Sequence, residues 1–203
     1  MPITKTFSNG QVLTSSALAP DDLNKILQTL TLAVLGIDPA LDAQAYSKVR
    51  VAWTTQPGFT FSDDVVSIQT KERDDAYSKI RDRKYTPNDG VSAVQTDTYS
   101  RTWEATFVCY GPNGFANASL IKSAMNLDFV HDTLKASALA LVTDFGAVVR
   151  APELRDGQWW QRSDWRVRIY ERVTESLTVP TVASVEVKLY SDLHGLVADI
   201  RTP

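Results

Sequence analysis

Hydrophobic positions first recur at helical spacing after Pro20. Pro20, Asp21 and Asp22 suit the start of a helix, and Gly36 suits its end. One face of this segment is apolar at the spacing of an amphipathic helix, through Leu23, Ile26, Leu27, Leu30 and Val34. The sequence therefore predicts a helix that starts near Pro20 and ends at Gly36.

The residues before this helix show little hydrophobic periodicity. They include Gly10 and the Ser15–Ser16 pair, which are typical of loosely packed chain. A chain of 203 residues falls within the size range of one domain. We therefore expect residues 1–19 to form an N-terminal arm and residues 20–203 to form a single α+β domain.

Alternating apolar and polar positions, which indicate strands, dominate the rest of the chain. The further elements predicted are helices at 116–127 and 128–139 and strands at 49–53, 64–71, 91–110, 158–173 and 182–190. This order, with its turn-rich links, favours an α+β fold. We expect an antiparallel or mixed sheet with long strands, with the 91–110 strand pairing with the 158–173 strand and the helices packed mainly on one face.

The strand from Gln158 to about Val173 carries two kinds of side chain, because successive residues of a strand point to opposite faces. The face expected to lie in the core carries Trp159, Trp165, Val167, Ile169 and Val173. The other face carries Trp160, Arg162, Asp164, Arg166, Arg168, Tyr170 and Arg172. Four arginines against one aspartate make this face basic, on a chain whose formal net charge is -3.

The arginine-rich face supports two hypotheses. In the first, it is a solvated surface whose arginines pair with Glu104, Glu171, Glu175 or Glu186. In the second, it meets a neighbouring subunit or lines the lumen of an assembly, since arginine is favoured at interfaces and binds carboxylates and phosphates through a planar fork. The candidate interface or lumen residues are Arg162, Arg166, Arg168, Arg172, Trp160 and Tyr170.

A second basic cluster lies in the charged stretch from Lys71 to Lys84, which the pattern predicts to be a loop. Its candidate contact residues are Lys79, Arg81, Arg83 and Lys84, with Asp74, Asp75 and Asp82 beside them. A solvated loop explains this cluster. The functional alternative is a loop that orders against a neighbouring ring or contacts the phosphates of DNA.

Few residues suit catalysis or metal binding. His131 and His194 have no metal-ligand spacing, and Cys109 alternates with Trp103 and Phe107 on a predicted core face, where an inert thiol is expected. We therefore expect no catalytic residues, no metal, no cofactor and a protein that is not an enzyme.

Composition limits the class of protein and the compartment in which the chain is expected to fold. The acidic net charge argues against a protein devoted to non-specific nucleic-acid binding, and a single cysteine excludes an internal disulfide. The N-terminus lacks the apolar segment of a signal peptide, and the most apolar run, at 30–37, is far shorter than a bilayer span. We expect no membrane contact and assembly in a bacterial cytoplasm.

Four motifs occur in the order found in one known family. They are Tyr99–Trp103, Tyr110–Asn113 before a helix, Arg150–Leu154, and Asp156–Arg162 followed by Asp164. Together they lie within residues 63–176, and over this stretch the chain resembles the phage neck terminator family of tailed phages and prophages. The glutamine and two tryptophans at 158–160, followed by Arg162 and Asp164, are the most specific part of the resemblance.

The resemblance implies a structural virion protein that forms a ring, typically of six copies, closes the tail tube and joins it to the head. The implied partners are further copies of the chain, the tail tube protein, head–tail connector or neck proteins and the tail sheath, with transient DNA contact in the lumen. The implied location is the virion neck at the top of the tail. The alternatives are another connector component, such as a stopper or adaptor, and a small DNA-binding protein.

Overall fold

The computed structural model describes residues 3–52, 58–180, 185–191 and 195–202. The chain divides into two compact units. The core unit comprises Ala17–Ile80 and Tyr99–Val173, and the strand unit comprises Met1–Ser16, Arg81–Thr98 and Thr174–Pro203. The expected division into an arm at 1–19 and one domain at 20–203 stays a prediction.

The main sheet is mixed, as expected for an α+β fold. Its principal strands follow the order β1-β2-β11-β6-β4-β3. β3 (Val49–Val51) pairs with β4 (Val65–Arg73) in parallel, and β4 pairs with β6 (Ser92–Tyr110) antiparallel. The predicted neighbour relation of the two longest strands is confirmed, because β6 lies beside β11 (Arg162–Pro180) and each spans 19 residues.

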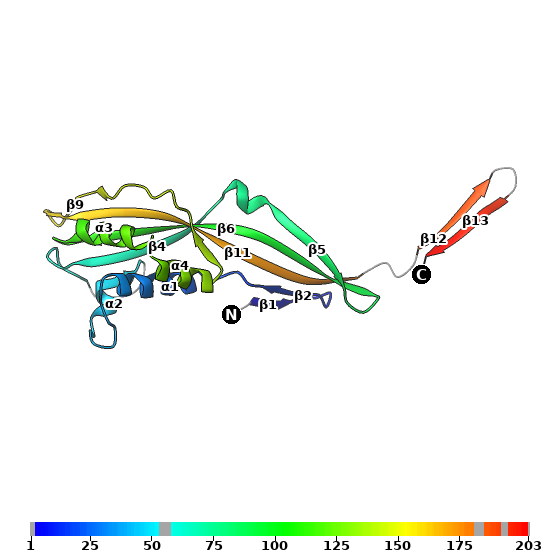
Figure 1. The fold of residues 1–203 in the computed structure, drawn as a ribbon, viewed down its shortest axis with the longest axis horizontal. Helices are drawn as coiled ribbons and strands as arrows, with labels where there is room; N and C mark the ends of the chain where they lie inside the picture. Colours follow the sequence, from blue (N-terminus) through cyan, green and yellow to red (C-terminus); the bar gives the residue numbers. More distant parts are fainter. Residues whose placement is uncertain (1–2, 53–57, 181–184, 192–194, 203) are drawn as a thin grey trace. The chain divides into compact units, whose positions relative to one another are not determined.

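The helices of the core unit form its hydrophobic core with one face of this sheet. They are α1 (Pro20–Val34), α2 (Ala45–Lys48), α3 (Gly114–Ala124) and α4 (Asp128–Ala136), shown in Figure 1. From the sheet side, the core receives alternate residues of β6 and β11, including Trp103, Phe107, Trp165 and Ile169. The first helix and the core face of β11 from Trp165 onward are therefore predicted correctly.

Short elements complete the core unit. β7 (Leu139–Leu141) and β8 (Val149–Arg150) each pair antiparallel with β11. β9 (Glu153–Arg155) and β10 (Gln158–Trp160) form a separate hairpin. A 3-10 helix, η1 (Ala76–Lys79), follows β4.

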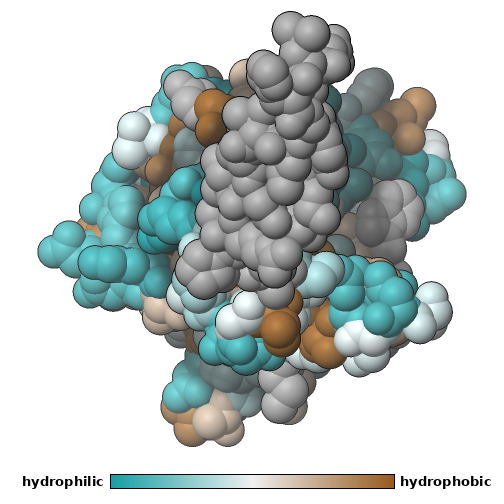
Figure 2. Space-filling model, turned by 90° about the vertical axis from the view of Figure 1, so that its right-hand side faces the viewer, coloured by the Kyte–Doolittle hydropathy of each residue, from teal (hydrophilic) through white to brown (hydrophobic). Residues whose placement is uncertain are grey.

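The strand unit contains β1 (Ile3–Thr6), β2 (Val12–Ser15), β5 (Arg81–Pro87) and the adjoining parts of β6 and β11. β1 pairs with β2, β2 with β11, and β5 with β6. Every residue of β5 is exposed. Most of the described residues visible in Figure 2 are hydrophilic, with separate hydrophobic residues between them.

Three expectations for individual segments are wrong. The 182–190 strand does not complete the main sheet, since β12 (Val185–Ser191) pairs with β13 (Gly195–Thr202) in a two-stranded sheet of its own. The stretch from Lys71 to Lys84 is not one loop, because β4 extends to Arg73 and β5 begins at Arg81. The 158–173 strand is interrupted at Gln161, where β10 ends and β11 has not begun.

The expected environments of the two adjacent tryptophans are also wrong. Trp159, expected in the core, is 68% exposed, whereas Trp160, expected on the outer surface, is 9% exposed. The reason is that β10 belongs to the β9–β10 hairpin, so the core face of β11 does not continue to Trp159. Trp160 is instead covered by Phe59, whose ring centroid lies 5.5 Å away.

Candidate assembly surfaces

Arg162 is the most strongly paired of the four predicted arginines. Its Nε and one terminal nitrogen donate to the two carboxylate oxygens of Asp164 at 2.8 Å each, and the other terminal nitrogen lies 3.1 Å from Glu153. These bonds, chiefly those to Asp164, raise the pKa of Arg162. Arg162 is therefore fixed within its own chain.

The other three arginines leave more positive charge at the surface. Arg166 and Arg172 are exposed, and Arg168 lies 3.4 Å from Asp144, whose side chain is itself 84% exposed. Tyr170 lies between them in the strand and is partly buried. An exposed pair of this kind contributes little stability, so the Arg168–Asp144 pair adds little to the stability of the fold.

Lys71 and Arg73 on β4 extend this basic surface across the sheet. Both bind Glu104 of β6, whose side chain is only 6% exposed. Trp103 lies in the core, so Glu104 points to the opposite face, which is also the face of Arg168 because Ile169 is a core residue. We call this surface the outer face: Lys71, Arg73, Glu104, Arg162, Asp164, Arg166, Arg168 and Arg172.

The carboxylates expected to pair with the arginine-rich face bind other cations. Glu104 binds Lys71 and Arg73, Glu171 binds Arg101, and Glu175 binds Arg81. The side chain of Glu186 lies outside the described residues. Burial raises the pKa of Glu104, but Lys71 and Arg73 outweigh burial and hold that pKa below its ordinary value.

The second basic cluster does not act as one loop. Lys79 ends η1 and lies 3.3 Å from Asp74, while Lys84 lies 3.5 Å from Asp82. Arg81 and Arg83 are two residues apart on β5 and both approach Asp97. The structure therefore brings only Arg81 and Arg83 together, and it does so within the strand unit.

A row of polar and charged side chains links four strands of the strand unit: Arg81, Arg83, Asp97, Glu175 and Ser15. The guanidinium of Arg83 donates two 2.8 Å hydrogen bonds to Asp97, and Arg81 lies 3.3 Å from Glu175. Glu175 and Ser15 are register partners. The hydrogen bonds from Arg83 hold the pKa of Asp97 below its ordinary value.

Glu171, expected as a surface partner of the arginine-rich face, is instead a buried carboxylate that organises the core unit. Glu171 is 1% exposed and accepts hydrogen bonds from the Trp103 indole at 2.7 Å, the Arg101 guanidinium at 2.9 Å and the Leu18 amide at 2.6 Å. Arg101 also donates to the Leu18 carbonyl. The sequence contains one signal for this buried ion pair: alternation places both Glu171 and Arg101 at core-facing positions of neighbouring strands.

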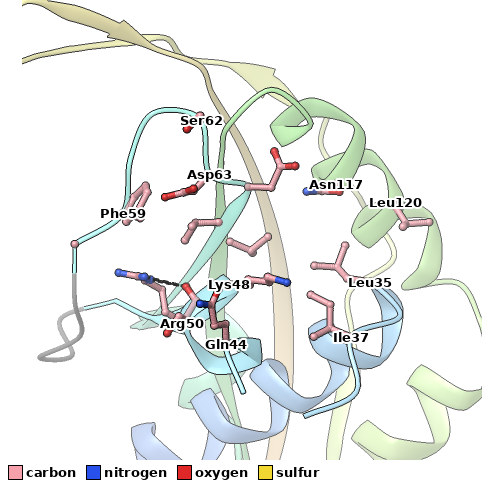
Figure 3. Close-up of a pocket in the computed structure, with 15 residues that line it drawn as sticks. Leu35, Ile37, Gln44, Lys48, Arg50, Phe59, Ser62, Asp63, Asn117 and Leu120 are labelled. Atoms are coloured by element: carbon pink, nitrogen blue, oxygen red, sulfur yellow. Dashed lines mark hydrogen bonds between the residues drawn. The ribbon is translucent and has the colours of Figure 1, made fainter. Parts of the chain in front are cut away.

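An open cavity of about 830 Å³ lies between the 58–66 segment, α2 and α3 (Figure 3). Its charged lining residues already have partners: Arg50 donates to the Ser47 carbonyl, Lys48 binds Asp42, Asp63 accepts from Thr60 and Asp64 accepts from Asn113. The Arg50 guanidinium also lies 4.8 Å from the Phe59 ring centroid. These side chains serve the local structure.

The remaining candidate chemistry is equally limited. Burial raises the pKa of the Cys109 thiol to about 12, so at neutral pH it is not a nucleophile. Within the described residues, no group of three or more histidine, cysteine or acidic side chains is placed to hold a metal ion. No described helix has the length and apolar character needed to cross a membrane.

The described residues thus define an α+β protein with a charged outer face. The family described as phage neck terminator protein matches residues 21–192. The chain therefore belongs to the phage neck terminator family, which confirms the resemblance, and it has a structural role in the phage neck. No curated protein matches the chain significantly.

Proposed function

We propose that copies of this chain form a closed ring of six that ends the growth of the phage tail tube and joins it to the head–tail connector. The observation that carries the proposal is the family match, which spans 21–192 and so includes the whole of both long strands. The proposed partners are the tail tube protein, connector or neck proteins and the tail sheath. Assembly would take place in the host cytoplasm.

A ring of identical chains needs a heterologous interface, in which one patch contacts a different patch on the next copy. The outer face is one candidate patch, because Arg166 and Arg172 are exposed and Asp144, which pairs with Arg168, is itself exposed. Arg162, Trp160 and Tyr170 would support that surface from within the chain. In the lumen alternative, the same arginines would make transient, sequence-independent contacts with DNA phosphates.

Deleting the gene for this chain tests the proposal. Electron microscopy of the resulting particles should show separate heads and tails, with tails of irregular length. Separate heads with tails of normal length would indicate a connector part such as a stopper or adaptor. Normal virions would contradict the proposal.

Charge reversal tests the outer face. The double variant R166E/R168E should lower the yield of joined particles or the retention of DNA, while K25E/K135E, at two exposed lysines of α1 and α4, should leave both unchanged. If R166E/R168E behaves like the control, the outer face is only a solvated surface.

The alternative function, a small DNA-binding protein, belongs to a different class. Titration of the purified chain with duplex DNA distinguishes this alternative from the ring protein. Tight binding to unrelated duplexes at physiological salt, falling steeply as salt rises, would support the DNA-binding class. The ring proposal predicts weak binding by the free chain, since its formal net charge is -3.

A further inference from the structure

We propose that β12 of one copy adds, as an antiparallel strand, to the edge of β5 that faces away from β6 on the next copy. This inference rests on the proposed ring and names one of its contacts. Strand addition joins two different surfaces of the same chain, so it supplies the heterologous interface that a ring requires. Backbone hydrogen bonds give such a contact its strength, and side chains set its register.

The β12–β13 hairpin lacks the further strand that a stable sheet needs. Among the described strands, β12 and β13 pair only with each other. A two-stranded hairpin is marginally stable in water, and a third strand or a packed layer is needed for independent stability. Since the hairpin pairs with no described strand of its own chain's main sheet, we infer that its partner is a strand of a second copy.

Of the two hairpin strands, β12 has the more regular edge. Leu189 and Tyr190 are adjacent in β12. Their partners in β13, Ala198 and Leu196, are not adjacent, because Val197 lies between them. Such a bulge interrupts the backbone ladder of the strand that carries it and commonly protects an edge from pairing. Every residue of β12 has a register partner, so its edge suits regular strand addition.

β5 offers a receiving edge on the main sheet. Among the described strands it pairs only with β6, and all of its residues are exposed. An exposed edge strand is a template for pairing with another chain, and charged residues on it discourage strands whose charges do not match. β5 begins with the charged residues Arg81–Lys84, so it selects a partner strand by charge.

The two faces of β5 have different roles. Arg81 and Arg83 both approach Asp97, so they lie on one face. Asp82 and Lys84 lie on the opposite face, where their exposed side chains are 3.5 Å apart. An exposed pair of this kind contributes little stability, so both charges can take new partners at little cost.

β12 carries the complementary charges at the same spacing. Glu186 and Lys188 are two residues apart and therefore share one face of the strand. In an antiparallel register, Lys84 of one copy lies opposite Glu186 of the next, and Asp82 lies opposite Lys188. Both positions join opposite charges, which favours this register over those that oppose like charges.

The same register suits the other face of β12. Val185 and Val187 alternate with the charged residues, and Ile200 is the partner of Val187 in β13, so these three positions share a face. Tyr85 of β5, which is 58% exposed, comes opposite Val185. Aromatic and β-branched residues at opposite positions stabilise a strand pair.

Cysteine cross-linking in assembled particles tests this contact. The chain would carry K84C and E186C, at positions that face each other in the proposed register, and would be the only source of this protein. The native Cys109 is buried and would not react with a short bifunctional thiol reagent. The matched control is K84C/K25C, which moves the second cysteine to α1, where the Lys25 side chain is 75% exposed.

The expected result is a ladder of covalently linked multimers for K84C/E186C and only monomer for K84C/K25C. Adding D82K, which sets two lysines opposite each other, should remove the ladder, and adding D82K together with K188D should restore it. The melting temperature of the purified D82K chain should not change, because the Asp82 side chain is 65% exposed.

Several results would overturn this contact while leaving the proposed function in place. They are a protein that is present in the neck but gives no ladder, a link that forms only within one copy, a ladder that D82K leaves unchanged, and a ladder that K188D does not restore. Absence of the protein from the neck overturns the proposed function as well.

Discussion

The hydrogen bonds of Glu171 show how a single polar residue shapes the core unit. Its carboxylate joins Arg101 and Trp103 of β6 to Leu18, which lies just before α1. The Arg101 guanidinium also lies 4.6 Å from the Trp103 ring centroid. A buried charge is tolerated when it is paired and fully hydrogen-bonded, and removing one partner leaves the other without compensation.

The variant E171Q should therefore lower the free energy of unfolding by about 3 kcal/mol, because it removes the buried carboxylate that pairs with Arg101. The remaining acidic partner, Glu72, lies 3.9 Å from Arg101 and is half exposed. Denaturant unfolding followed by circular dichroism measures this loss. The control is D144N, at an exposed partner of Arg168, which should change stability by less than about 0.5 kcal/mol. Equal losses in the two variants would contradict the assigned role of Glu171.

Trp159 and Trp160 provide a matched pair, since they are adjacent and of the same residue type. Trp160 packs against Phe59 and Tyr110, so W160A should cost about 3–5 kcal/mol of unfolding free energy. W159A should cost less than about 0.5 kcal/mol, because its side chain is largely in solvent. Thermal melting of both variants measures the difference, and a larger loss for W159A would show that their environments are assigned wrongly.

At the scale of the elements, the row of charged side chains that crosses the strand unit makes the stability of that unit depend on pH. Arg83 lowers the pKa of Asp97 in the folded chain. A group with a lowered folded pKa stabilises fully above its unfolded pKa, about 3.9 for aspartate, and loses that contribution as pH falls through the folded pKa. The contribution of Asp97 is therefore complete at neutral pH and lost in acid.

The variant D97N should be less stable than the original chain at pH 7, and the gap should narrow below about pH 4. Melting temperatures of both chains between pH 7 and pH 2 test this expectation. D144N serves as the reference for an exposed aspartate. A gap that stays constant across this pH range would show that the Asp97 carboxylate does not contribute through its charge.

Element positions were largely predictable from the sequence, whereas several environments were not. Periodicity located α1, and alternation located the core face of β6 and of β11 from Trp165 onward. Alternation failed at Trp159, because the break at Gln161 and the separate pairing of β10 are tertiary features. The cross-strand partners of Arg81 and Arg83 could not be predicted either, because they depend on β5 pairing with β6.

For the whole molecule, the division into two compact units separates two kinds of surface. The core unit carries the outer face and the β9–β10 hairpin. The strand unit contains the outer strands β1 and β5 of the main sheet, which are exposed throughout, and the separate β12–β13 sheet. Membership of the phage neck terminator family implies that the protein associates with other components of the phage neck or tail.

A cryo-electron microscopy reconstruction of the neck of intact particles tests the proposed ring most directly. The account predicts a closed ring of six copies of this chain between the end of the tail tube and the head–tail connector. A neck without this chain, or with the chain present as separate copies that make no mutual contact, would contradict the account.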